Sequence, residues 1–366
     1  MSQSDELKKR SISLIRDNQA ESGAFITSPE FRQYGYCWFR DSSFIAYSML
    51  VNGEPEACKL FLEWGDRVVC AQRGLITNLI EKRRAGEPIR REELLPSRYM
   101  PDGSAHADEH PGTQIDGFAD WLWCLGEYAS LTGDTRGVTG MEESVRLIVR
   151  YLEAFWDLPG QDCWEENDEG IHLSTFACVA GGLKRINHLL GEKELNDLAA
   201  RIVNRALEIA EPAGFIPKSL NDNRPDASTL LFSAVFRILP PESPVLKRTV
   251  VAIESELCAG GTGGVRRYGK DTYYGGAEWI YTTALLALHY LRLGKTERAG
   301  TLLEWMEARF DKDSMLMEPQ VSEICRPEWV SWWEGHWGVL KGPNLWAHAM
   351  YLIVHKEMNR HVSGVR

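Results

Sequence analysis

Apolar residues follow a helical spacing along almost the whole chain. Leu7, Ile12, Leu14 and Ile15 begin this pattern, and a second clear example spans residues 121–131. Because apolar residues three or four positions apart lie on one face of an α-helix, each such segment predicts an amphipathic helix. The alternating pattern typical of strands is rare. About twelve helices are predicted, the others at residues 41–52, 54–71, 139–157, 173–190, 193–211, 226–239, 244–258, 276–294, 296–311 and 344–358.

Short and long connections alternate between these helices. Gly53, Gly133, Gly191 and Gly294 end helices, and the next helix begins within a few residues, which makes antiparallel neighbours. Longer connections rich in glycine, proline and aromatic residues lie at 20–40, 85–116, 157–172, 212–226, 259–276 and 312–343. This pattern favours six helical hairpins in a closed ring, with the long loops on one face. An open solenoid is disfavoured because no repeated signature is present, and no linker divides residues 1–366, so we expect a single domain.

Charge and composition exclude several classes of protein. The formal net charge is −11 and no long basic run is present, so we expect no binding to nucleic acid. The N-terminal residues contain no charged-then-apolar signal region, and no apolar stretch is long enough to span a bilayer. We therefore expect a cytoplasmic protein that makes no membrane contact. The eight cysteines form no CxxC pair, so neither a zinc site nor a disulfide framework is predicted.

The long loops concentrate aromatic and charged residues. One short stretch alone contains Tyr34, Tyr36, Trp38, Arg40 and Asp41. Aromatic rings pack against the C–H faces of a pyranose, and charged planar groups bind its hydroxyls. Such rings also fill protein cores, but their concentration in loops favours a sugar-binding site.

A second loop carries adjacent carboxylates in the run Asp162-Cys163-Trp164-Glu165-Glu166. Glycoside hydrolysis needs one protonated carboxyl for the leaving oxygen and a second carboxylate that activates water or attacks carbon. A neighbouring acid and a neighbouring indole both raise the pKa of a carboxyl, which suits a general acid. Paired acids are also common in exposed loops, so this pair by itself is a weak signal.

Together these loops resemble the glucoamylases, glycoside hydrolase family 15. Residues 162–166 match the family's Asp-x-Trp-Glu-Glu acid loop, and residues 34–41 match its aromatic-x-Tyr-x-Trp-x-Arg-Asp substrate loop. Three further matching segments, 114–117, 267–279 and 343–349, follow in the family's order. The resemblance extends from residue 23 to 352. It implies an all-α (α/α)6 barrel with Glu165 as the general acid.

The resemblance also implies roles for other residues. Arg40 and Asp41 would grip the hydroxyls of the terminal glucose, Tyr34 would help to seat the attacking water, and Arg267 would be a second sugar-binding arginine. The remaining expected substrate-binding residues are Trp38, Gln114, Asp116, Trp164, Glu166, Tyr268, Trp279 and Trp346. The family's reaction needs neither a metal nor an organic cofactor.

The general base is less clearly marked. Bacterial relatives carry Leu-Pro-Glu-Gln-Val at this position, whereas here the run reads Met317-Glu318-Pro319-Gln320-Val321. Glu318 is the first choice because a loop can absorb a one-residue shift. Glu323 is the alternative base and Glu334 a distant third. Single displacement with inversion predicts that the two catalytic carboxyls lie about 6.5–9.5 Å apart.

Family members release glucose from the non-reducing end of α-1,4-glucans, of isomaltose and other α-1,6-linked sugars, or of trehalose. The motifs most resemble those of intracellular bacterial members acting on isomaltose-type sugars. We therefore expect an inverting exo-α-glucosidase that releases β-D-glucose from short α-1,6-linked oligosaccharides. The alternatives are an α-1,4-glucan glucohydrolase or trehalase, another (α/α)6 carbohydrate enzyme, or a non-catalytic sugar-binding relative. The sequence gives no indication of oligomeric state.

Overall fold

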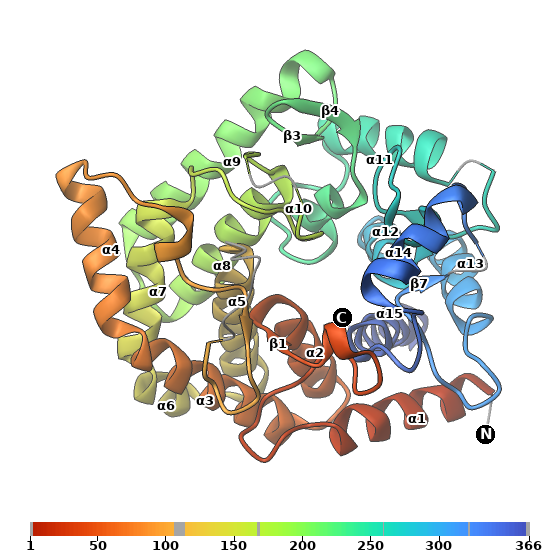
Figure 1. Cartoon of the computed structure of the whole chain (residues 1–366), viewed down its shortest axis with the longest axis horizontal. Helices are drawn as coiled ribbons and strands as arrows, with labels where there is room; N and C mark the ends of the chain where they lie inside the picture. Colours follow the sequence, from red (N-terminus) through yellow and green to blue (C-terminus); the bar gives the residue numbers. More distant parts are fainter. Residues whose placement is uncertain (1–2, 106–113, 167–168, 259, 321–322, 364–366) are drawn as a thin grey trace.

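The helices form two concentric layers in the computed structural model, which describes residues 3–105, 114–166, 169–258, 260–320 and 323–363 (Figure 1). Along the inner layer each helix contacts the next, and the last contacts the first, which closes the ring. The inner helices are α2 (Phe39–Val51), α5 (Asp116–Thr132), α8 (Leu173–Leu190), α10 (Leu231–Ala234), α12 (Ile280–Arg292) and α15 (Leu345–Ser363).

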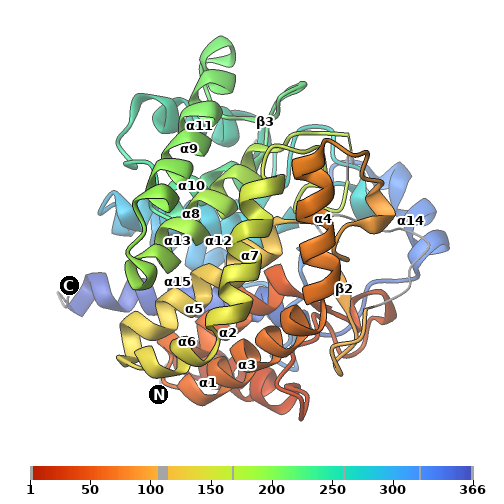
Figure 2. The same ribbon diagram turned by 90° about the vertical axis from the view of Figure 1, so that its left-hand side faces the viewer.

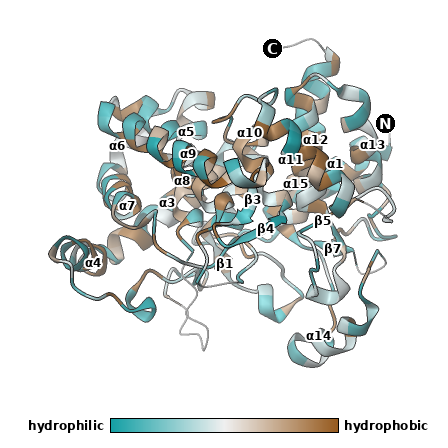
Figure 3. Cartoon of the chain, turned by 90° about the horizontal axis from the view of Figure 1, so that it is seen from above, coloured by the Kyte–Doolittle hydropathy of each residue, from teal (hydrophilic) through white to brown (hydrophobic). Residues whose placement is uncertain are grey.

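An outer helix accompanies each inner helix. The outer helices are α1 (Gln3–Asp17), α3 (Pro55–Ala71), α7 (Glu142–Phe155), α9 (Lys193–Ala213), α11 (Pro244–Leu257) and α13 (Thr296–Glu307). Viewed from above, the short strands and α14 lie on one side of the ring, and the two termini lie on the other (Figure 3). The prediction of an all-α (α/α)6 barrel with its long loops on one face is confirmed.

Burial distinguishes the two layers. Every residue of α2 is buried, and so is every residue of α12 except Arg292. In α9 the buried residues recur every three or four positions, from Leu195 to Ile209, and the opposite face is polar. A helix that is apolar all round is stable only when other elements enclose it, whereas an amphipathic helix can cover the outside. The sequence therefore assigns each helix to its layer.

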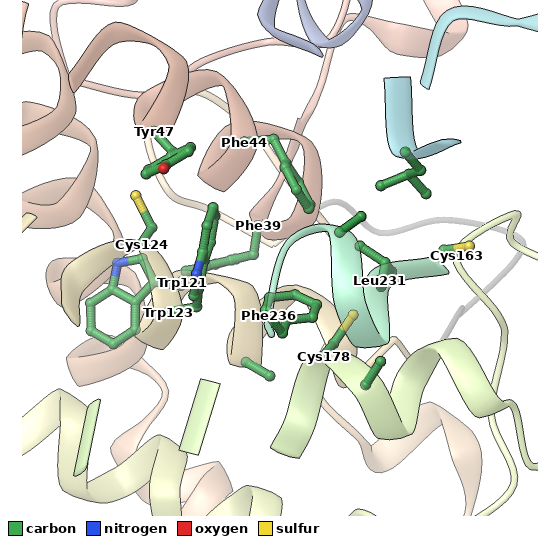
Figure 4. Close-up of a cluster of buried hydrophobic side chains, with 14 of the residues drawn as sticks. Phe39, Phe44, Tyr47, Trp121, Trp123, Cys124, Cys163, Cys178, Leu231 and Phe236 are labelled. Carbon is green, nitrogen blue, oxygen red and sulfur yellow. The ribbon is translucent and has the colours of Figure 1, made fainter. Parts of the chain in front are cut away.

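Large side chains fill the centre of the barrel. Figure 4 shows Phe44 and Tyr47 of α2 beside Trp123 of α5, with ring centroids 5.5 and 4.6 Å from that of Trp123. The backbones of α5 and α8 approach so closely that a β-carbon on Gly182 would lie 2.3 Å from the carbonyl oxygen of Ala119. Only glycine permits that approach. The interior is a packed core rather than a channel.

Short antiparallel strands connect the loops on one face. β1 (Cys37–Trp38) pairs with β2 (Arg98–Tyr99), and β3 (Pro217–Ser219) pairs with β4 (Asp222–Pro225). A third ladder joins β5 (Val265–Arg266), β6 (Glu278–Trp279) and β7 (Pro319–Gln320) in that order. β1 and β6 run directly into the inner helices α2 and α12. These ladders therefore hold loop side chains against the ends of the inner helices.

The predicted helix at 226–239 is wrong over most of its length. Asp226 accepts a hydrogen bond from the backbone N–H of Ser228 at 2.8 Å and starts a tight 3-10 turn, Ala227–Leu230, before the four-residue α10. Arg237 then adopts a left-handed backbone with φ 53°, and two prolines follow. Local side-chain hydrogen bonds of this kind compete with regular helix.

Three helices were not predicted: α4 (Arg73–Ala85), α6 (Thr135–Gly140) and α14 (Val330–Trp337). α4 lies beside α7 and buries only Ile76, Leu79 and Ile80, so its apolar stripe is short within a charged sequence (Figure 2). α14 buries no residue at all. Single 3-10 turns at Arg32–Tyr34, Arg91–Glu93, Tyr273–Gly275 and Pro327–Trp329 complete the loops. No helix within the described ranges combines the length and the apolarity needed to cross a bilayer.

Candidate active site

The long loops enclose a cavity of about 720 Å3. Most of the site residues predicted from the sequence line it: Tyr34, Trp38, Arg40, Asp41, Trp164, Glu165, Glu166, Arg267, Trp279, Glu318 and Trp346. Gln114, Asp116 and Tyr268 lie behind this lining and contact residues that belong to it. Residues from five separate loops thus converge on one space.

Arg40 and Asp41 lie in the first turn of α2, directly after β1. The Arg40 guanidinium donates to Gln114 Oε1 at 2.7 Å and to Asp41 Oδ1 at 3.2 Å, and lies 3.6 Å from Asp116 Oδ2. Asp41 also accepts a hydrogen bond from the Thr27 hydroxyl at 2.7 Å. Each buried charge therefore has an opposite charge or a hydrogen bond, which holds the pair rigidly toward the cavity.

Gly117 explains why the segment 114–117 lies so near Arg40. A β-carbon at this position would lie 2.9 Å from the backbone nitrogen of Arg40. Glycine thus permits the N-termini of α2 and α5 to meet. That contact brings Gln114 and Asp116 to the arginine side chain.

Asp162 organises the loop that carries the two adjacent glutamates. Its Oδ1 accepts hydrogen bonds from the backbone N–H groups of Trp164 at 3.1 Å and Glu166 at 3.0 Å. The chain turns so tightly here that Glu165 has a left-handed backbone, with φ 63°. Strain of this kind persists only where the surroundings hold the residue in place.

A buried cation anchors this loop to the β3–β4 hairpin. Lys218 Nζ contacts Asp162 Oδ2 at 2.5 Å and Asp226 Oδ2 at 3.0 Å, and Trp164 Nε1 donates to Asp226 Oδ2 at 2.9 Å. Burial favours the neutral form of Asp162, but Lys218, His172 and the hydrogen bond from the Glu166 backbone N–H together lower the pKa of this carboxyl. The acid loop is therefore fixed by charges that have no access to solvent.

We expect Lys218→Met to destabilise the fold by about 3–5 kcal/mol, because removal of one partner leaves two buried carboxylates uncompensated. Urea unfolding followed by circular dichroism measures this change. Lys193→Met is the matched control, since Lys193 pairs with Asp197 on an exposed helix face and should matter little. A loss below about 1 kcal/mol for Lys218→Met would contradict the anchoring role.

The two adjacent glutamates have different surroundings. Glu166 accepts a hydrogen bond from Arg267 Nη2 at 2.9 Å on one carboxyl oxygen and another from the Tyr268 hydroxyl on the other. Glu165 lies 3.7 Å from Arg40 Nη2 and keeps 34% of its side chain exposed. Burial raises the pKa of Glu165, and the Arg40 guanidinium partly opposes this rise. Glu166 is held by two hydrogen bonds, whereas Glu165 keeps a partly exposed carboxyl with a raised pKa.

Arg267 stabilises the part of the cavity wall next to Glu166. Its guanidinium makes two hydrogen bonds to Asp271, at 2.7 and 2.6 Å, and lies about 5 Å from the ring centroids of Trp164 and Trp279. An arginine stacked between aromatic rings presents its remaining hydrogen-bonding edge in a fixed direction.

Glu318 lies at the N-terminus of α12. Its Oε1 accepts a hydrogen bond from the backbone N–H of Tyr281 at 2.9 Å, and its side chain is buried. Burial raises its pKa to about 8, while the hydrogen bond from Tyr281 opposes this rise. The free N–H groups of a helix N-terminus favour an ionised carboxylate. The Glu318 carboxyl can therefore either take up a proton, as a general base does, or carry one, depending on the pH.

The two other candidate bases lie apart from the cavity lining. Glu323 Oε1 forms an ion pair with Arg309 Nη1 at 3.4 Å. Glu334 lies on α14, outside the residues that line the cavity. Of the three, only Glu318 lies on the cavity lining with Glu165.

Several buried polar atoms of the lining residues have no partner within the described parts of the chain. They include Glu318 Oε2, Trp279 Nε1 and Trp346 Nε1. A buried donor or acceptor left without a hydrogen bond costs free energy. A ligand rich in hydroxyl groups would satisfy both kinds of atom.

Three parts of this site were missed in the sequence. Thr27 has no motif of its own, although its hydroxyl holds Asp41. The hydroxyl of Tyr273 forms a hydrogen bond with that of Tyr34. Tyr273 lies within the segment 267–279, which matches a family motif, and this location could have identified it. Trp332 and its neighbours on α14 also line the cavity. Their signal was the density of aromatic residues in an expected loop.

Comparisons with known proteins agree on one family. The model for "Glycosyl hydrolases family 15" matches residues 7–313. An isomaltose glucohydrolase from Kribbella flavida is 32% identical over 362 residues, which cover 96% of this chain and 92% of that protein. The structure of a glycosidase variant in complex with glucose aligns with a TM-score of 0.92 and 31% identity, over 97% of this chain and 96% of that one.

A more distant structure shows the same fold. The glucoamylase from Saccharomycopsis fibuligera aligns with a TM-score of 0.72 at 14% identity, over 98% of this chain and 95% of that chain. The resemblance found in the loop motifs is confirmed by the family model and by the Kribbella relative. The chain belongs to the glycosyl hydrolases of family 15.

Proposed function

We propose that this protein is an inverting exo-α-glucosidase that releases β-D-glucose from isomaltose and short α-1,6-linked oligosaccharides. The observation that carries the proposal is a pair of glutamates in one cavity with different surroundings. Glu165 lies on a constrained turn beside Arg40, and Glu318 lies at the N-terminus of α12. An inverting enzyme needs two carboxyls with separate roles.

Glu165 acts as the general acid in this mechanism, and Glu318 as the general base. Glu165 gives its proton to the glycosidic oxygen as the bond from that oxygen to the anomeric carbon breaks. Glu318 takes a proton from a water molecule, whose oxygen forms the new bond on the opposite face of the sugar. The products are β-glucose and the shortened saccharide, and the two glutamates have exchanged protonation states.

The closed end of the cavity supports an exo mode of action. Arg40 and Asp41 are only 4% exposed, and Trp346 of the same lining packs against the buried Tyr281 with ring centroids 4.2 Å apart. A saccharide therefore cannot pass through the barrel. The buried Arg40–Asp41 pair offers hydrogen bonds to the hydroxyls of a terminal glucose.

The preference for isomaltose rests on the relative from Kribbella flavida, whose name states that substrate. The test is a panel of isomaltose, maltose, trehalose and kojibiose with glucose release as the readout. Proton NMR of the first product should show β-glucose from isomaltose. Faster release from maltose or trehalose would reassign the linkage, and no release from any of the four would refute the proposal.

One limb of the pH profile should report Glu318. In the free enzyme burial raises the pKa of this group to about 8, and kcat/KM follows the titration of the free enzyme's catalytic groups. We expect a bell-shaped profile with one apparent pKa of about 8, which the residual activity of Glu318→Gln should lack. Measurement of kcat/KM for isomaltose across the pH range tests this. Two limbs that both lie below about pH 6 would contradict it.

A further inference from the structure

The helix α14 and the turn before it carry an exposed group of aromatic residues. Trp332 is 52% exposed and Trp329 is 37% exposed, and within the described residues no other tryptophan is among the exposed large apolar side chains. No residue of α14 is buried, so its aromatic residues do not belong to the core. A cluster of exposed aromatic side chains marks a contact site more often than a packing site.

These rings continue the lining of the active-site cavity. Trp332, Trp333, His336 and Trp337 line the same space as Glu165 and Glu318. His336 stacks on Trp332 with ring centroids 5.0 Å apart and planes inclined by 19°, and Trp333 meets Trp332 edge to face at 4.8 Å. The result is a stacked pair of nearly parallel rings beside a perpendicular one.

The helix is held in place from the catalytic side. The Trp333 ring lies 4.8 Å from that of Tyr273, whose hydroxyl bonds Tyr34. The hydroxyl of the next residue, Tyr274, donates to the carbonyl oxygen of Gly338 at 2.5 Å, at the end of α14. The aromatic face is therefore fixed in direction relative to the site of bond cleavage.

Exposure increases along the cavity. Arg40 and Asp41 at its closed end are 4% exposed, Glu165 keeps a third of its side chain exposed, and Trp332 keeps more than half. In an exo-acting enzyme the terminal glucose occupies the closed end, so the rest of the saccharide must extend past Glu165 toward the mouth. The volume of about 720 Å3 is that of a pocket for a ligand larger than one sugar ring.

We propose that α14 is a platform for the second and third sugar units on the leaving-group side. Its stacked Trp332–His336 pair packs against the C–H face of a pyranose, so the enzyme favours oligosaccharides of three or more glucose units over the disaccharide. This inference rests on the proposed function, because that function fixes which end of the saccharide lies at the mouth.

The test compares kcat/KM for isomaltotriose with kcat/KM for isomaltose. We expect a ratio above one in the unmodified enzyme and a fall of this ratio by about tenfold in Trp332→Ala, which is about 1.4 kcal/mol of lost binding to the transition state. Trp332→Tyr should keep most of the ratio because it retains an aromatic face. Leu131→Ala is the control, since Leu131 is an exposed large apolar residue on α5 that lies outside the cavity lining.

Each outcome has a distinct meaning. If isomaltose is hydrolysed but Trp332→Ala leaves the ratio unchanged, the platform is wrong while the proposed function stands. If no α-glucoside is hydrolysed, the proposed function fails and the platform with it. If light scattering shows a dimer that Trp332→Ala converts to a monomer, the rings cover a second copy of the chain, and that result also overturns the platform.

Discussion

Glu165→Gln is expected to lower kcat for isomaltose about 10³-fold, because the leaving oxygen then receives no proton from the enzyme. Steady-state glucose release measures kcat. Binding should survive, since Glu165 lies 3.7 Å from Arg40 Nη2, whereas Glu166 accepts a hydrogen bond from Arg267 at 2.9 Å. Calorimetric titration of the variant with isomaltose should therefore give an affinity close to the KM of the unmodified enzyme.

A substrate with a better leaving group separates the acid from its neighbour. The fluoride ion leaves α-glucosyl fluoride without a proton from the enzyme. Glu165→Gln should therefore hydrolyse this substrate at a rate near that of the unmodified enzyme. Glu166→Gln is the matched control: loss of its contacts with Arg267 and Tyr268 should raise KM for both substrates. Equal losses on isomaltose and on the fluoride in Glu165→Gln would show that this residue is not the acid.

Glu318→Gln should also lower kcat about 10³-fold, but with the opposite response to the fluoride. The reaction still needs a deprotonated water after the leaving group has been activated, so α-glucosyl fluoride should not restore the rate. The amide is close in size to the carboxyl and can still accept from the Tyr281 N–H, so the fold should be retained. Rates on both substrates and a circular dichroism spectrum measure these expectations.

The alternative base provides the control for Glu318. Glu323→Gln should remain near the unmodified rate, because Glu323 pairs with Arg309 away from the cavity lining. Glu318→Ala makes room for azide, a nucleophile that needs no base, and β-glucosyl azide should then form from the fluoride. Should Glu323→Gln lose activity while Glu318→Gln keeps it, the assignment of the base is wrong.

The sequence predicted the helical layers well because burial imposes a pattern on them. Buried residues recur every three or four positions in outer helices such as α9, and inner helices such as α12 are buried on every face. The helix predicted at 226–239 was too long, since α10 covers only Leu231–Ala234, and the exposed α14 was not predicted; the two errors have different causes. The Asp226 side chain accepts a hydrogen bond from the backbone N–H of Ser228, which shapes the chain before α10. α14 has no buried face, so its sequence shows no apolar periodicity.

Site residues could be predicted where they belong to a recognisable sequence motif. Arg40, Asp41 and Glu165 were found because each lies in a run of several characteristic residue types. The buried cation Lys218 could not be found, since its partners Asp162 and Asp226 come from distant parts of the chain. The single domain, the cytoplasmic location and the separation of the two catalytic carboxyls stay predictions.

The packed centre of the barrel determines the order in which products leave. Phe44, Trp123 and Tyr281 block the inner end, so the mouth beside α14 is both entrance and exit. After cleavage the new glucose lies behind the shortened saccharide, which must depart first. The same saccharide cannot move inward by one glucose unit while that glucose remains bound. Each cut therefore requires a fresh encounter, and free glucose should compete directly with the next substrate for the innermost position.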